Sequence, residues 1–91
     1  MEKIISMPFM YQDNEYHSLV RVFQHSPVDY ILRITIMNGE LQSKFQGHHI
    51  FTIKDGQLQV DVPSEKVEVA RLKFQIADAL NKYFEVHPVF E

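Results

Sequence analysis

Two turn signals, Asn38-Gly39 and Asp55-Gly56, constrain the fold of residues 28–62 more than any other feature of the sequence. A two-residue hairpin loop needs positive φ at both central positions, and an Asx-Gly pair adopts that geometry at little steric cost. Apolar and polar residues alternate on both sides of each pair, as they do in half-buried strands. Each pair therefore predicts a two-residue β-hairpin.

The two predicted hairpins agree on which side chains face the core. The first turn places Leu32 opposite Phe45, and the second places Ile53 opposite Leu58, with side chains of one parity on one face. A single strand over residues 40–54 serves both hairpins, because its odd-numbered residues point inward in each. This strand is long, so Gly47 within it is predicted as a bend.

Alternation on the N-terminal side predicts a further hairpin. Pro8 indicates an edge strand, because proline lacks the N–H that a central strand donates to the ladder. A two-residue loop at Asp13-Asn14 would pair Tyr11 with Tyr16. The predicted strands cover residues 3–11, 15–25, 29–37, 40–54 and 57–62.

Helical spacing of apolar residues begins after Pro63. Ser64 is a suitable N-cap, and Val69, Leu72 and Ile76 begin one stripe of a helix predicted over residues 65–85. We expect an α+β fold: a curved five-stranded antiparallel meander with one C-terminal helix on one face, in two layers and a single domain over residues 1–91. The side chains expected to face the helix are Ile5, Met7, Val20, Val22, Tyr30, Leu32, Ile34, Ile36, Leu41, Phe45, Phe51, Ile53, Leu58 and Val60.

Composition excludes several classes of function. The chain has no cysteine, which excludes disulfides, thiolate catalysis and cysteine-ligated zinc. Its net charge of −3 is unlike that of strongly basic nucleic-acid binders. The first residues do not have the pattern of a signal peptide, and no apolar run approaches the length of a membrane span. We expect a soluble cytoplasmic protein.

No motif predicts catalysis or a cofactor. His48 and His49 are adjacent, so on a strand they would point to opposite faces and could not chelate one ion together. The sequence has no Gly-x-Ser-x-Gly elbow and no glycine-rich phosphate loop. We therefore expect no enzyme activity, no cofactor and no metal.

The predicted face away from the helix carries the candidate binding surface. A three-residue loop over residues 26–28 places Arg21 opposite Arg33, and the first turn places Arg33 opposite Lys44. Like charges that face each other across a sheet are destabilising, so this cationic row needs an explanation. Phe23 and Ile31 lie beside it. The candidate surface is therefore Arg21, Phe23, Ile31, Arg33 and Lys44.

Three interpretations of this surface remain open. The cationic stems can lie over apolar neighbours while their heads reach Asp29, Glu40 or solvent. The face can instead bind protein, most simply a second copy in a homodimer. It can also bind single-stranded nucleic acid, with Phe23 as a stacking platform. A secondary candidate surface on the helix margin and tail comprises Phe74, Phe84 and Phe90. The sequence favours a non-catalytic protein-interaction module that self-associates, with the nucleic-acid-binding domain as the alternative.

Overall fold

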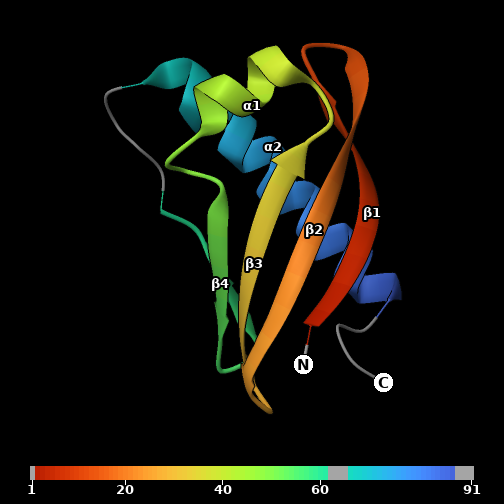
Figure 1. The fold of residues 1–91 in the computed structure, drawn as a ribbon, viewed down its shortest axis with the longest axis vertical. Helices are drawn as coiled ribbons and strands as arrows, with labels where there is room; N and C mark the ends of the chain where they lie inside the picture. Colours follow the sequence, from red (N-terminus) through yellow and green to blue (C-terminus); the bar gives the residue numbers. More distant parts are fainter. Residues whose placement is uncertain (1, 62–65, 88–91) are drawn as a thin grey trace.

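The computed structural model describes residues 2–61 and 66–87. Five antiparallel strands form one sheet in the order β1-β2-β3-β4-β5, and helix α2 runs behind it in Figure 1. The elements are β1 Glu2–Tyr11, β2 Asn14–Ser26, β3 Asp29–Ile36, α1 Gly39–Phe45, β4 Ile50–Lys54, β5 Gln57–Gln59 and α2 Val67–Val86. The predicted α+β fold, a five-stranded antiparallel sheet with one C-terminal helix, is confirmed.

The loop of the first hairpin lies earlier than predicted. Gln12 and Asp13 form it, with φ of 50° and 62°, so both residues are in the left-handed region that a two-residue loop requires. Tyr11 therefore pairs with Asn14, and the predicted pairing of Tyr11 with Tyr16 is wrong by two residues. A shift of two residues leaves every side chain on the same face, so the inward residues are unchanged.

The prediction of a hairpin at Asn38-Gly39 is wrong. Residues Gly39–Phe45 form helix α1, and Asn38 is its N-cap, with its Oδ1 accepting the N–H of Leu41 at 3.1 Å. Only Ile50–Lys54 of the predicted strand over residues 40–54 is a strand. Strand β3 consequently pairs with β4, so that Leu32 faces Phe51 rather than Phe45.

The two other predicted turns are close to the observed ones. Asp55 and Gly56 have φ of 53° and 78°, and Ile53 pairs with Leu58 as predicted. Between β2 and β3 the predicted pairs hold as far as Gln24, after which a bulge makes Ser26, rather than His25, the partner of Asp29. The three sheet turns thus keep the predicted inward parity.

A hydrogen-bonded cluster joins the β2–β3 and β4–β5 turns. The Ser26 hydroxyl donates to Asp29 Oδ2 at 2.9 Å, and the Asp55 N–H donates to Asp29 Oδ1 at 3.0 Å. These two hydrogen bonds, the Asp55 N–H first, lower the pKa of the Asp29 carboxyl below its usual range. The carboxylate therefore ties two loops that are far apart in the sequence.

The core lies between the sheet and α2, and α1 closes one end of it. Leu41 and Phe45 project from α1 into this core, and the Phe45 ring lies 6.5 Å from that of Phe51. The buried hydrophobic residues are Ile5, Met7, Phe9, Tyr11, Val20, Val22, Leu32, Ile34, Ile36, Leu41, Phe45, Phe51, Ile53, Val69, Leu72, Ile76, Ala77 and Leu80. Tyr30 and Leu58 are only partly buried, and the prediction that Val60 is a core residue is wrong because its side chain is exposed. Ser64, the predicted N-cap, lies outside the described residues.

Lys73 of α2 is a charged residue within this core. Its ammonium lies 5.2 Å from the centre of the Phe51 ring, where a cation–π interaction offsets part of the cost of burial. Desolvation lowers the pKa of Lys73, and the nearby Asp61 carboxylate opposes that shift. We assign Lys73 a structural role between α2 and β4.

Candidate binding surface

The outer face of the sheet, opposite α2, is the surface on which the sequence placed its candidate residues. It faces the viewer in Figure 1, and no helix of the described part of the chain lies over it. Side chains on this face alternate along each strand with those of the core. The strand registers therefore determine which outer residues are neighbours.

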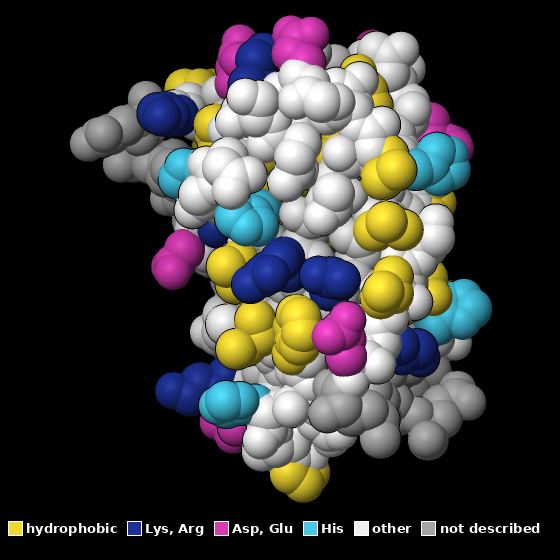
Figure 2. Space-filling model, in the orientation of Figure 1, with side chains coloured by type: hydrophobic (Ala, Val, Ile, Leu, Met, Phe, Trp, Pro, Cys, Tyr) yellow, Lys and Arg dark blue, Asp and Glu magenta, His cyan; other side chains and the backbone are white. Residues whose placement is uncertain are grey.

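Two arginines occupy the centre of the outer face. Arg21 of β2 pairs directly with Arg33 of β3, as predicted, and Ile4 and Ile50 flank them on β1 and β4. Figure 2 shows this arrangement as two dark blue side chains side by side, with yellow side chains on both flanks. The central row thus combines two cations with two aliphatic residues.

The neighbouring row supplies partners for the arginines. Phe23 pairs with Glu2 on one side and with Ile31 on the other. Arg21 Nε lies 3.8 Å from Glu2 Oε1, and the Arg33 guanidinium carbon lies 5.9 Å from the centre of the Phe23 ring. The positive charge of Arg21 is therefore partly balanced by a carboxylate, and that of Arg33 by the face of an aromatic ring.

These contacts change one of the three interpretations. Arg21 contacts Glu2, whereas the sequence suggested Asp29 or Glu40 as partners for the cations. An exposed ion pair at this distance contributes little to stability. The contacts explain how the two arginines are tolerated, but they leave the surrounding apolar surface unexplained.

Lys44 does not belong to this surface. It lies on α1, where its ammonium is 3.7 Å from a Glu40 carboxylate oxygen and 3.6 Å from one of Glu68 on α2. The residue opposite Arg33 is Ile50, so the predicted cationic row across three strands is wrong. The physical reason is the helix, which removes residues 40–45 from the sheet.

Apolar side chains surround the arginine pair. Ile4 is 57% exposed and Ile50 46%, and Leu19 is also exposed one row further along β2. Pro8, Met10 and Met37 extend this surface toward the β1–β2 loop. Isolated apolar residues on a surface need no explanation, but a contiguous apolar patch is typical of an interaction site.

The structure does not bring the secondary candidate residues together. Phe74 is 57% exposed on α2. Phe84 packs against the core with its ring edge-on to Tyr83, at 5.6 Å between centroids. Phe90 lies outside the described residues. Phe74 and Phe84 are separated by roughly 15 Å along the helix axis, so they do not form one surface.

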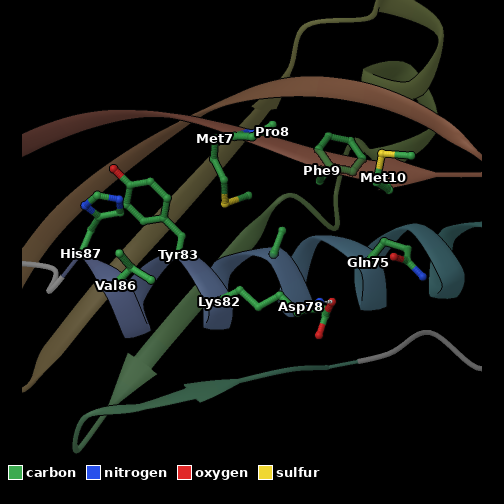
Figure 3. A pocket seen from close by; sticks show the side chains of 11 residues that line it. Met7, Pro8, Phe9, Met10, Gln75, Asp78, Lys82, Tyr83, Val86 and His87 are labelled. Carbon is green, nitrogen blue, oxygen red and sulfur yellow. Dashed lines mark ion pairs between the residues drawn. The ribbon is translucent and has the colours of Figure 1, made fainter.

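Sequence reasoning missed a groove between β1 and α2. It has a volume of about 450 Å³ and is lined from one side by residues of β1, including Met7 and Phe9, and from the other by residues of α2, including Tyr83 and Val86 (Figure 3). The edge position that Pro8 indicates was the available signal. An edge proline alone could not predict a groove, because the placement of α2 beside β1 depends on the whole core.

Neither the described residues nor known proteins assign a function to this chain. Within residues 2–61 and 66–87, no three histidine or acidic side chains are placed to hold a metal ion. In the same ranges, neither helix combines the length and apolar character needed to cross a bilayer. Comparisons with protein-family models, curated proteins and solved structures found no match. The function must therefore be inferred from the chemistry of the surfaces.

Proposed function

We propose that this chain is a cytoplasmic, non-catalytic protein-interaction module that self-associates through the outer sheet face. The observation that carries the proposal is the set of exposed apolar side chains around the arginine pair, Ile4 and Leu19 on one side and Ile50 on the other, on a face that no described helix covers. A face of this kind stays exposed in an isolated molecule, whereas a second copy would bury it. A chain without cysteine is compatible with a reducing compartment.

Charge on the outer face favours a second copy as the partner. Glu2 and Arg33 lie on the same face in adjacent rows, on opposite sides of β2. Two such faces can pack against each other about a twofold axis that lies in the plane between them, midway between these residues. Glu2 of one protomer would then lie next to Arg33 of its partner, and the reverse. The face is then complementary to itself in charge as well as in apolar character.

The size of the face is also suitable. The two longest extents of the molecule are 33 and 24 Å, which bound the projected face at roughly 800 Å², about the area that each partner contributes to a standard interface. Stable self-association would therefore use most of the sheet face. Arginine is well suited to the centre of such an interface, because its planar guanidinium stacks on aromatic rings and is weakly hydrated.

Light scattering coupled to size-exclusion chromatography tests the proposal at micromolar to millimolar concentrations. We expect a dimer for the wild-type chain and a monomer for Ile50→Lys, which places a lysine in the apolar surface. Phe74→Lys makes the same kind of change on α2 and should leave the dimer intact. A monomeric wild-type chain would contradict self-association, and loss of the dimer only in Phe74→Lys would assign the interface to the helix.

The alternative function is binding of single-stranded nucleic acid by Arg21, Phe23 and Arg33. The guanidinium over the Phe23 ring favours it, because bases stack on aromatic side chains and arginine planes. Glu2 beside Arg21 weighs against it. Titration of a labelled oligonucleotide at several salt concentrations separates the two functions. For a nucleic-acid site, Arg33→Gln should reduce the salt-dependence slope by about 0.7 for one lost phosphate contact.

A further inference from the structure

The backbone of β1 forms one edge of the sheet, and the hydrogen bonds show which of its residues face outward. The Met37 N–H donates to the His17 carbonyl at 2.8 Å, so His17 directs its backbone groups toward β3. Backbone directions alternate along a strand, and Ser18 therefore faces β1. The Ser18 hydroxyl donates to the Met7 carbonyl at 2.9 Å, which is consistent with this direction. Met7 and Phe9 thus bond to β2.

The intervening residues of β1 direct their backbone groups away from the sheet. Ser6 and Met10 each offer an N–H and a carbonyl, whereas Pro8 offers only a carbonyl. No strand of the described chain pairs with this edge. It therefore presents a short, interrupted row of donors and acceptors to solvent.

The groove between β1 and α2 lies along this same edge. Its volume of about 450 Å³ is within the range of roughly 300–1,000 Å³ that is usual for ligand pockets. Met10 and Val86 are exposed on its two sides. In Figure 3 the side chains from β1 lie above, Gln75, Asp78 and Lys82 of α2 lie below, and Tyr83 of α2 rises beside Met7 at one end. Asp78 and Lys82 line it and pair with each other at 3.0 Å, so their charges cancel.

From these observations we propose that the β1 edge binds an extended, uncharged peptide segment of another protein as a sixth strand. The backbone of the segment continues the ladder at Ser6 and Met10, and every second side chain, which is apolar, enters the groove against α2. An uncharged segment fits because the lining acid and lysine already neutralise each other. This site uses the backbone edge and the α2 side of β1, whereas self-association uses the outer face around Ile4, Leu19 and Ile50; Pro8 and Met10 border both surfaces.

Pro8 explains why the occupant is a different chain rather than a second copy. If two copies paired β1 against β1, each would bring a proline, and the ladder would lack two N–H donors near its centre. A segment without proline leaves only the one N–H of Pro8 missing. Pro8 therefore limits edge-to-edge self-pairing and still permits strand addition.

Short, end-capped, fluorescein-labelled peptides test the proposal. One set alternates threonine with valine, isoleucine, phenylalanine or methionine, and the control set has proline at alternate positions so that it cannot join a ladder. Fluorescence anisotropy should show saturable binding of the first set only. Amide exchange measured by NMR should slow at Ser6 and Met10 when a peptide is bound, because these N–H groups then donate to it.

Three variants of the full chain sharpen this test. Pro8→Val restores the missing N–H donor and should tighten binding about fivefold, the effect of one hydrogen bond. Val86→Lys puts a charge at the groove and should weaken binding about tenfold, the effect of one lost apolar contact. Val67→Lys makes the same change at an exposed valine of α2 outside the groove and should have no effect. Circular dichroism checks that each variant is folded.

Three results would each overturn the proposal. The first is that Pro8→Val, which has the most complete edge, fails to bind any of the alternating peptides. The second is that the proline-containing control peptides bind as tightly as the alternating ones, which would mean that the groove takes up apolar side chains without a ladder. The third is that peptides bind while amide exchange at Ser6 and Met10 is unchanged. None of these results affects the self-association proposal, whose test uses the outer face and light scattering.

Discussion

The two Asx-Gly pairs carry the same local signal, but they adopt different structures. Asp55-Gly56 forms a two-residue turn with positive φ at both residues. Asn38 is instead extended, at φ −155°, and caps a helix that starts at Gly39. The difference comes from the residues on the C-terminal side of each pair. Gln57 and Leu58 continue as a strand, whereas Gly39–Phe45 form helix α1, supported by the ion pair between Glu40 and Lys44.

The residues of α1 have a pattern that is compatible with both a helix and a strand. Leu41 and Phe45 are four residues apart, a spacing that places them on one face both of a helix and of a strand. Glu40 and Lys44 form an ion pair at the same spacing, and such a pair supports a helix. A short apolar pattern thus fits two periods, and an Asx residue is suitable both as a turn residue and as an N-cap.

The largest expected effect tests the helical assignment of residues 39–45. Phe45→Ala removes a fully buried ring that packs against Phe51, so it should lower the free energy of unfolding by about 3–5 kcal/mol in urea denaturation. Ser43→Lys is the control. The helix exposes Ser43, so lysine should be tolerated there, whereas the predicted strand would point it into the core. A large loss of stability in Ser43→Lys would contradict the helix.

Valine substitution of the two turn glycines should have unequal effects. Gly56 has φ of 78°, which a β-branched residue resists, so Gly56→Val should cost about 1–3 kcal/mol. Gly39 needs no positive φ, and an added Cβ would meet no neighbouring atom. Gly39→Val should therefore change stability much less in the same measurement. Equal losses would mean that both pairs form turns.

Removal of the N-cap should destabilise α1 by a smaller amount. Asn38→Ala loses the side-chain acceptor for the Leu41 N–H, which should cost about 0.5–2 kcal/mol in thermal or urea unfolding. Asn38→Asp keeps an acceptor at the helix N-terminus and serves as the control, with stability near that of the wild type. If alanine and aspartate gave the same loss, the cap would not be the reason for it.

The smallest effect concerns the carboxylate behind the Asp55-Gly56 turn. The pKa of Asp29 is lowered in the folded state, so its contribution to stability is present above the unfolded pKa and is lost as pH falls through the folded one. Urea unfolding between neutral pH and acidic pH should show this loss in the wild type. Asp29→Asn should reduce the pH dependence, whereas Ser26→Ala, which removes only the weaker of the two hydrogen bonds that lower this pKa, should reduce it less.

In the observed strands and in α2, sequence alone determined which side chains face inward, because side-chain direction follows a short local period. Val20 with Ile34 and Ile53 with Leu58 pair as predicted, and Leu72 and Ile76 lie on the buried stripe of α2. These features depend on alternation, helical spacing and turn chemistry, which are properties of neighbouring residues. The placement of Arg21 opposite Arg33 results from them as well.

Only the tertiary structure decided between patterns that local chemistry leaves equivalent. A shift of two residues in the first hairpin preserves every face, so side-chain parity could not distinguish Tyr11 opposite Asn14 from Tyr11 opposite Tyr16. The spacing of Leu41 and Phe45 likewise fits a helix or a strand, and the helix separates Lys44 from the two arginines. The contact of Arg21 with Glu2 and the groove beside β1 depend on packing between distant segments, which no local period encodes.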